Sequence, residues 1–355
     1  MWVASIPWTL EPQGLARTKH RPRGFGSTEH WRERRRGVAQ AANPSNARLY
    51  NQLTSGIRIR LMKTADLLRL ILLGAIWGGS FFFMRMVSPV LGAAYLAQGR
   101  VLAAALFLAG LSLYFGRKPQ LRTRAVHYFT LGFFNSALPF MLFAYASLEL
   151  STAELAILNA MSPAWGFLIG LARRTEALTL KRGLGLLMGV LGVAILLGIF
   201  SANHHQANAL AVGLGLVGAM SYGVASNYAK VSKGVEPFDN AHGSLWASVI
   251  LIIPALFFLP VKSSPTPEVI WITLTIGVVC TGVAFLLYFR LIQDIGATSA
   301  LTVTYLIPLF ASLWGVLFLH ENLSANTLIG MLVIITGTAW VTEFDWKAVF
   351  NVRDM

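Results

Sequence analysis

The sequence has little charge and almost no cysteine. Asp, Glu, Lys and Arg make up 12% of its 355 residues, about half the share in soluble globular chains. The single cysteine, Cys280, lies within an apolar run. An intramolecular disulfide and a cysteine-based metal site are therefore both excluded. The sequence also lacks a Gly-rich phosphate-binding loop, which argues against direct use of ATP.

Apolar residues take the place of the missing charge. Hydrophobic residues account for 55% of the chain, and the mean hydropathy is +0.60. They gather in blocks of about 20 residues, the length of a helix that crosses the ~30 Å hydrocarbon core of a bilayer. We predict an all-α integral membrane protein with ten transmembrane helices, over residues 67–87, 91–115, 126–147, 152–172, 183–200, 209–229, 242–261, 268–289, 297–319 and 325–343.

The positive charges lie beside these blocks. The formal net charge is +14, but 11 of the 29 Lys and Arg lie in residues 1–61 and the others cluster in short loops, so nucleic acid is not an expected partner. With a cytoplasmic N-terminus, thirteen Lys and Arg fall on the inner side, and only Arg85 and Lys262 on the outer side. This asymmetry follows the positive-inside rule. We therefore expect a multi-pass protein of a bacterial inner membrane, the cell membrane, with both termini in the cytoplasm.

The two ends of the chain differ from the apolar part. Residues 1–61 are basic, contain several Pro and Gly, and have no apolar run long enough for a core. We expect a disordered basic tail. It is dispensable, or it reflects a start assigned too far upstream, since Met62 opens a start-like stretch, "MKTADLLRLILLG". Residues 344–355 are expected to form a short cytoplasmic tail.

Two similar phrases indicate an internal repeat: "AMSPAWGFLIGLARRTEAL" begins at Ala160, and "YLIPLFASLWGVLFLHENL" begins at Tyr305. An offset of 145 residues relates six pairs: Pro163 and Pro308, Gly170 and Gly315, Glu176 and Glu321, Leu178 and Leu323, Gly185 and Gly330, and Gly192 and Gly337. The chain is thus predicted to hold two five-helix units, 67–200 and 209–343. Because five is odd, the second unit starts on the opposite side of the membrane, so the units are inverted repeats.

The phrase from Tyr288 to Leu323 resembles the drug/metabolite transporter superfamily, as do "GAIWGGSFFFMR" in the first predicted span and Arg100 in the second. Within it, the chain is similar to ten-span proteins with two EamA domains, over about residues 67–343. The resemblance implies a secondary transporter that exports small metabolites, amino acids or drug-like compounds. One departure is Thr175 before Glu176, where the family usually has Gly before Glu.

The expected partners are a small-molecule substrate and the lipid bilayer. No cofactor is expected, and whether the protein forms a homodimer stays open. Transport direction, coupling ion and substrate identity stay open too.

Prolines inside predicted spans point to a central site. They are Pro139, Pro163 and Pro308. Each lacks a backbone N–H and frees the carbonyl four residues earlier. These carbonyls belong to polar residues: Asn135, Asn159 and Thr304. Two roles remain open, because the kinks either offer polar groups to a substrate in a cavity or satisfy only the local backbone.

Further candidates are one cation and two aromatic residues. Arg100 lies about ten residues into the second span, where it either anchors the structure or contacts an anionic substrate. Trp77 and Tyr305 lie beside small or polar residues and are candidates for the cavity wall. Glu176 and Glu321 are expected at the membrane edge, where they either stabilise the N-terminus of the next helix or act as gates.

Two other classes of function remain as alternatives, an intramembrane enzyme and a membrane receptor or structural protein. An enzyme would need a nucleophile or a metal cluster at depth, and the predicted spans contain no His, Asp and Glu cluster. No carboxylate lies deep within a predicted span either, so a proton relay through a buried acid is not supported. We therefore assign no catalytic and no metal-binding residue.

Overall fold

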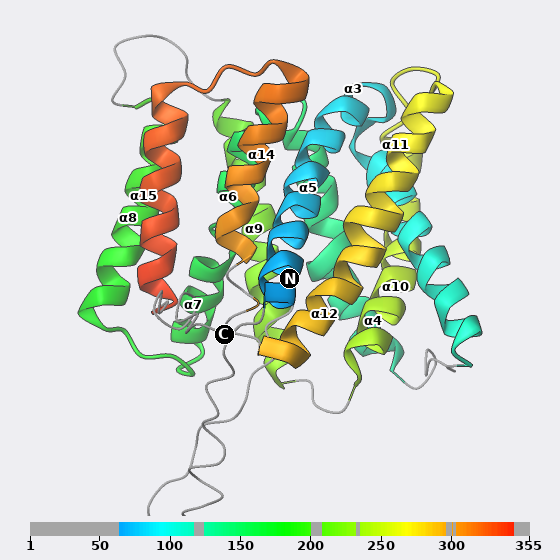
Figure 1. Cartoon of the computed structure of the whole chain (residues 1–355), viewed down its shortest axis with the longest axis horizontal. Coiled ribbons are helices and arrows are strands. Elements are labelled where there is room, and N and C mark those ends of the chain that lie inside the picture. Colours follow the sequence, from blue (N-terminus) through cyan, green and yellow to red (C-terminus); the bar gives the residue numbers. More distant parts are fainter. Residues whose placement is uncertain are drawn as a thin grey trace, which may run out of the picture. The chain divides into compact units, whose positions relative to one another are not determined.

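Every regular element in the described part of the chain is helical (Figure 1). The computed structural model describes residues 64–116, 124–199, 208–231, 235–295, 300 and 303–343. The predicted tails 1–61 and 344–355, and several inner-loop charges such as Arg117 and Lys233, lie outside these residues. Contacts divide the chain into one unit of residues 1–5 with 62–355 and a second of residues 6–61, and the second lies outside the described residues as well.

Six helical stretches of the described chain are long and apolar enough to cross a membrane: Thr64–Tyr114, Ala125–Ala146, Thr152–Ala172, Ala209–Ala229, Pro237–Phe258 and Pro267–Tyr288. Three further helices have 17 residues each: α8 (Leu180–Leu196), α14 (Val303–Leu319) and α15 (Ala325–Val341). Large apolar side chains such as Leu187, Phe257 and Trp271 are exposed. An apolar outer surface of this kind suits contact with lipid.

The longest element, α3 (Thr64–Tyr114), consists of two helices joined at Gly92, whose φ of 69° and ψ of 173° are not helical. A positive φ favours glycine, which has no Cβ. The backbone N–H groups of Lys262 and Ser263 donate to the Val90 carbonyl, at 3.2 and 3.1 Å. The loop that follows α10 (Pro237–Phe258) therefore meets the bend of α3.

Two of the long stretches contain a widened, π-helical turn. The first runs as α4 (Ala125–Gly132), η1 (Phe133–Ala137) and α5 (Leu138–Ala146). The second runs as α11 (Pro267–Gly277), η2 (Val278–Val283) and α12 (Ala284–Ile295). The turns begin 145 residues apart, at Phe133 and Val278, which is the repeat offset. Single π-helical turns often mark functional sites.

The prolines of the fourth and ninth predicted spans behave differently. α6 (Thr152–Asn159) ends before Pro163 and α7 (Ser162–Ala172) starts anew. The Asn159 carbonyl accepts a 2.6 Å hydrogen bond from Ser162 Oγ, so this carbonyl has a partner within the same span. In contrast, α14 continues through Pro308 as one helix. The third proline, Pro139, follows η1 in the first turn of α5.

Helices α8 and α15 lie side by side (Figure 1) and cross at glycines. A Cβ added to Gly185 would lie 2.6 Å from the Gly337 carbonyl oxygen, and a Cβ added to Gly337 equally close to that of Gly185. Gly192 faces Gly330 in the same way, at 3.2 and 3.0 Å. Because Gly185 and Gly192 are the repeat mates of Gly330 and Gly337, the contact is reciprocal, as across a two-fold axis.

A second pair of contacts also repeats at the offset of 145. On α3, a Cβ at Gly78 would lie 2.8 Å from Phe310 Cβ and from the Ala311 nitrogen of α14. On α9 (Ala209–Val231), a Cβ at Gly223 would lie 2.9 Å from Trp165 Cβ and 2.8 Å from the Gly166 nitrogen of α7. Each glycine thus admits the corresponding helix of a repeat unit to close backbone contact.

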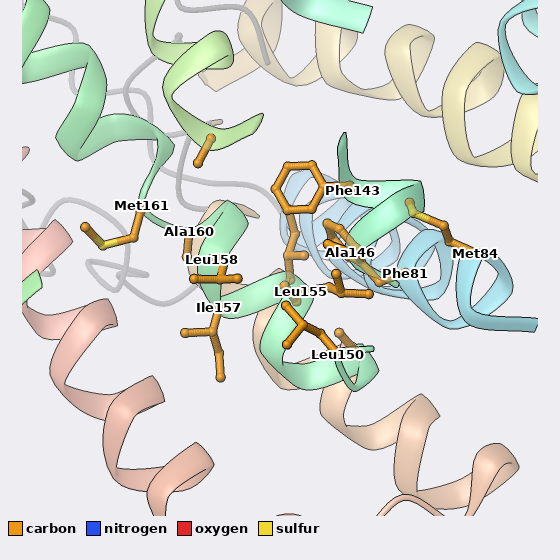
Figure 2. Close-up of a cluster of buried hydrophobic side chains, with 14 of the residues drawn as sticks. Phe81, Met84, Phe143, Ala146, Leu150, Leu155, Ile157, Leu158, Ala160 and Met161 are labelled. Carbon is orange, nitrogen blue, oxygen red and sulfur yellow. The ribbon is translucent and has the colours of Figure 1, made fainter. Parts of the chain in front are cut away.

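Helix α6 contributes to one of the two buried hydrophobic clusters. Leu155, Ile157 and Leu158 are fully buried there. Phe81 of α3 and Phe143 of α5 belong to the same cluster, and Figure 2 shows them gathered beside α6. A capping box fixes the start of α6, since Ser151 Oγ accepts from the Glu154 N–H and the Glu154 carboxylate accepts from the Ser151 N–H. Helix α6 thus has a defined N-terminus.

Candidate functional site

A cavity of about 70 Å³ lies between the two predicted repeat units. Residues from α3, η1, α5 and α6 line it on one side, and residues from α9, η2, α12 and α14 on the other. Aromatic side chains form a large part of the wall: Trp77, Phe81, Phe140, Phe143, Tyr222 and Phe285. The polar side chains of the wall are Ser80, Arg100, Asn135, Asn159 and Thr281.

The aromatic side chains form contacts that hold the wall in place. The ring centroids of Phe81 and Phe143 are 5.7 Å apart at an interplanar angle of 68°, and Phe143 stacks on Tyr222 at 6.3 Å. Trp77 packs against Tyr288 at 5.4 Å. These distances lie in the favourable range for aromatic pairs. Phe143 and Tyr222 join α5 to α9, so this part of the wall spans both units.

Arg100 is the one charged side chain among the described residues of the cavity wall. It is 8% exposed. Its Nε donates to Thr281 Oγ1 at 2.9 Å, and its guanidinium carbon lies 3.8 Å from the centroid of the Phe140 ring. Thr281 Oγ1 in turn donates to the Ile276 carbonyl at 3.1 Å. Among the described residues, no carboxylate forms an ion pair with this guanidinium.

The structure brings four of the six substrate-site candidates to this wall: Trp77, Arg100, Asn135 and Asn159. Thr304 and Tyr305 are not part of it. Thr304 is buried elsewhere in α14, and the Tyr305 hydroxyl forms a 2.8 Å hydrogen bond with Thr342 Oγ1 at the end of α15. Ile307 is the residue of α14 that reaches the wall.

Sequence reasoning missed the second π-helical turn as a source of wall residues. The offset of 145 maps Asn135 onto Cys280 and Ser136 onto Thr281, and both Cys280 and Thr281 line the cavity. The repeat could therefore have predicted them. The aromatic residues Phe140, Phe143 and Phe285 carry no comparable signal, because most aromatic residues in membrane helices only pack or lie at interfaces.

Glu321 connects the two units away from the cavity. Its carboxylate accepts hydrogen bonds from Thr152 N and Thr152 Oγ1, both at 3.0 Å, and pairs with Arg85 Nε at 3.3 Å. Thr152 is the first residue of α6. The expectation that Glu321 stabilises the next helix is therefore wrong, because α15 is capped by Ser324 and Glu321 serves a helix of the other unit. A carboxylate is favourable at that N-terminus.

Glu176, the repeat mate of Glu321, pairs within its own unit. Its carboxylate lies 3.2 Å from Nη1 of Arg182, a residue of the first turn of α8. Arg182 also pairs with Glu343, at 3.2 Å. The described residues hold no group of three or more His, Cys, Asp and Glu that could bind a metal ion.

Comparison with known families gives a match in both predicted units. The model of the EamA-like transporter family matches residues 65–198 and again residues 209–343. A solved structure described only as "Crystal structure of protein" has a TM-score of 0.51 and 18% identity to this chain, over 78% of this chain and 95% of that one. This likeness concerns the fold alone.

Several curated proteins are similar in sequence. The uncharacterized transporter YoaV of Bacillus subtilis (strain 168) is 28% identical over 167 residues, 46% of this chain. A WAT1-related chloroplastic protein of Arabidopsis thaliana is 27% identical over 275 residues, 73% of this chain. The matches cover 56% and 65% of the lengths of these two proteins. The protein PecM of Dickeya dadantii (strain 3937) is 22% identical over 277 residues, 76% of this chain and 90% of that protein.

Proposed function

Because the chain belongs to the EamA-like transporter family, we propose that it is a secondary transporter that exports small metabolites, amino acids or drug-like compounds by alternating access. The observation that carries the proposal is the cavity with a buried arginine, whose wall combines side chains of both family-matched units. A site placed between two repeat units is exposed to alternate sides when one unit rocks against the other.

The proposal includes ten spans arranged as two inverted repeats. With α3 taken as two spans across Gly92, and with α8, α14 and α15 added to the other long stretches, the chain crosses the membrane ten times. The reciprocal contact of α8 with α15 supports an axis that relates the two units. Gly185 faces Gly337 and Gly192 faces Gly330, so the two helices run in opposite directions there, as an axis in the membrane plane requires.

The size of the cavity also favours alternating access. The cavity measures about 70 Å³, whereas pockets that hold drug-sized ligands measure roughly 300–1,000 Å³. We expect the two units to separate on at least one side when a substrate enters, which widens the cavity around it.

The position of the charges supports an orientation in the cell membrane with both termini in the cytoplasm. Arg85 lies with Glu321, and Lys262 lies at the bend of α3; we place both regions on the outer side. A small-molecule substrate and the surrounding lipid are the proposed partners.

Metabolite profiles of the medium test the proposed export. Bacterial cells that express the wild-type chain should release at least one small compound in excess of cells without it. An Arg100→Gln variant at equal membrane abundance should lose most of this excess, whereas Arg290→Gln should keep it because the Arg290 side chain is exposed and lies outside the cavity wall. Identical profiles with and without the chain would contradict export.

A further inference from the structure

No carboxylate of the described residues pairs with Arg100, the buried cation of the cavity. A guanidinium stays protonated in proteins, and burial of a charge is costly unless an opposite charge or several hydrogen bonds compensate it. In the described residues, Arg100 has one hydrogen bond through Nε and one aromatic face, that of Phe140. Neither neutralises the charge. The planar fork of Nη1 and Nη2 suits the two oxygens of a carboxylate.

The number of charges on the ligand follows from the same wall. Of the described residues, Arg100 is the only cation that lines the cavity. A singly charged anion balances it, whereas a phosphate monoester brings up to two negative charges and would leave one of them buried without a partner. The geometry therefore favours a monocarboxylate over a phosphate.

The part of the wall that the structure describes also contains no Asp or Glu. Its other polar side chains, Ser80, Asn135, Asn159 and Thr281, are all neutral. An ammonium group in this small space would add a second cation within a short distance of Arg100, and no carboxylate of the wall could pair with it. Specificity often arises in this way, because a ligand group without a partner is rejected strongly.

The other residues of the wall indicate which kind of molecule carries the carboxylate. Phe81, Phe143 and Tyr222 form a continuous aromatic surface, and Trp77 and Phe285 extend it. Rings and alkyl chains bury their surface favourably against such side chains. Neutral hydroxyl and amide groups then supply the few directed hydrogen bonds.

We propose that this cavity binds organic monocarboxylates with an aromatic or other apolar body and without an ammonium group, and that Arg100 receives the carboxylate. The inference rests on the proposed transport function and narrows its substrate class, because it excludes zwitterionic amino acids. Thr281 is a positioning residue, since its hydroxyl holds the Arg100 guanidinium from the opposite unit.

Thermal stabilisation of the purified full-length protein in detergent tests the class with matched probes. 3-Phenylpropionate carries the carboxylate and the ring. Phenylalanine adds only the ammonium group, phenethylamine carries only the ammonium, and phenylphosphonate carries a larger negative charge. Stabilisation that grows with ligand concentration yields an apparent Kd. We expect 3-phenylpropionate to bind at least about tenfold more tightly than each of the other three.

Variants assign the effect to the cavity. Arg100→Lys keeps the charge and removes the planar fork, so it should weaken 3-phenylpropionate binding about tenfold. Thr281→Val should weaken it severalfold through loss of the hydrogen bond to Nε, and it keeps the proposal testable if Arg100→Lys does not fold. Arg290→Gln is the matched control and should bind as the wild type does.

Each outcome decides the inference. Tight binding of 3-phenylpropionate that both cavity variants weaken supports it. Binding of phenylalanine, phenethylamine or phenylphosphonate equal to or tighter than 3-phenylpropionate overturns the class, as does absence of stabilisation by 3-phenylpropionate. The proposed transport function fails separately, when the cavity cannot be reached by a thiol reagent from both faces of the membrane.

Discussion

At the scale of single residues, the most informative side chains are those that join the two units. Arg100 reaches across to Thr281 inside the cavity, and Glu321 reaches across to Thr152 at the start of α6. Both are charged groups in an apolar bundle: Glu321 pairs with Arg85, and no described carboxylate pairs with Arg100. Their hydrogen bonds therefore depend on the way the two units are packed.

The cap formed by Glu321 yields a stability prediction. Glu321→Gln removes the negative charge that accepts from Thr152 and pairs with Arg85, and the Glu321 side chain is only 11% exposed. Loss of charged hydrogen bonds should lower stability by about 1–3 kcal/mol, seen as a lower melting temperature in detergent. Glu268→Gln is the control, because Glu268 is exposed in the first turn of α11. Equal melting temperatures for the two variants would contradict the cap.

The sequence was a better guide to which residue types matter than to the faces on which they lie. Arg100, Asn135 and Asn159 reach the cavity as expected of polar groups that avoid lipid. Thr304 and Tyr305 lie off the wall, which α14 reaches through Ile307; α14 is mostly apolar, and its few polar residues do not define an inward face. Lipid and protein interior are equally apolar, so periodicity does not show which face of such a helix points inward.

At the scale of elements, the crossing of α8 with α15 depends on missing side chains. The carbonyl of Gly337 fills the space that a Cβ of Gly185 would need. The sequence predicted the glycine pairs through the repeat offset, but not that the two helices meet each other, since the offset relates positions and says nothing of contacts.

Gly185→Leu should therefore disrupt the fold. Overpacking typically costs about 1–3 kcal/mol, and here the clash is with backbone, which cannot move aside without separating the helices. We expect a clear loss of monodisperse protein and of melting temperature. Gly213→Leu is the matched control, because a Cβ at Gly213 meets nothing within 4 Å. If Gly185→Leu is as stable as Gly213→Leu, the helix crossing is wrong.

The π-helical turns were invisible in the sequence. η1 precedes Pro139, but Ala284 stands at the equivalent place after η2, so proline is not their common cause. A π-helical turn accommodates one additional residue, and its position at the cavity wall in both units brings Asn135 and Cys280 inward. Local propensity does not signal such an addition, because only the packing of the whole helix makes it necessary.

Deletion of Phe133 tests this account. Phe133 is 40% exposed in η1, and its loss should convert the turn to α-helix while the flanking helices keep their positions. We expect a folded protein with weakened 3-phenylpropionate binding. Deletion of Val217, which is 42% exposed within α9, should instead rotate all later residues by about 100° and abolish folding. Failure of both deletions to fold would argue against the additional residue.

At the scale of the whole molecule, the helix boundaries followed closely from hydropathy. The predicted span 152–172 begins where α6 begins and ends where α7 ends, and the predicted start at 325 is the start of α15. The predicted span 242–261 begins five residues after the start of α10 at Pro237, because the polar first turn of that helix hides its beginning. Bends and π-helical turns within a helix are harder to predict than its boundaries, since apolar composition shows where a span lies but not where it bends.

The proposed orientation can be tested with reporters that mature only in the cytoplasm. A fusion after Glu343 should be active, because this end is placed in the cytoplasm. A fusion after Lys262, at the loop that meets the bend of α3, should be inactive. An active reporter at Lys262, or an inactive one at Glu343, would reverse the proposed orientation.

The central claim is that the cavity between the two units opens to each side of the membrane in turn, and the chain contains its own reporter. Cys280 is the only cysteine of the sequence and lines the cavity. The measurement is the reaction of wild-type protein with a membrane-impermeant thiol reagent in right-side-out and in inside-out vesicles, with Cys280→Ala as the control. We expect slow labelling from both faces, slower still with 3-phenylpropionate present. Labelling from one face only, or from neither, would contradict alternating access at this site.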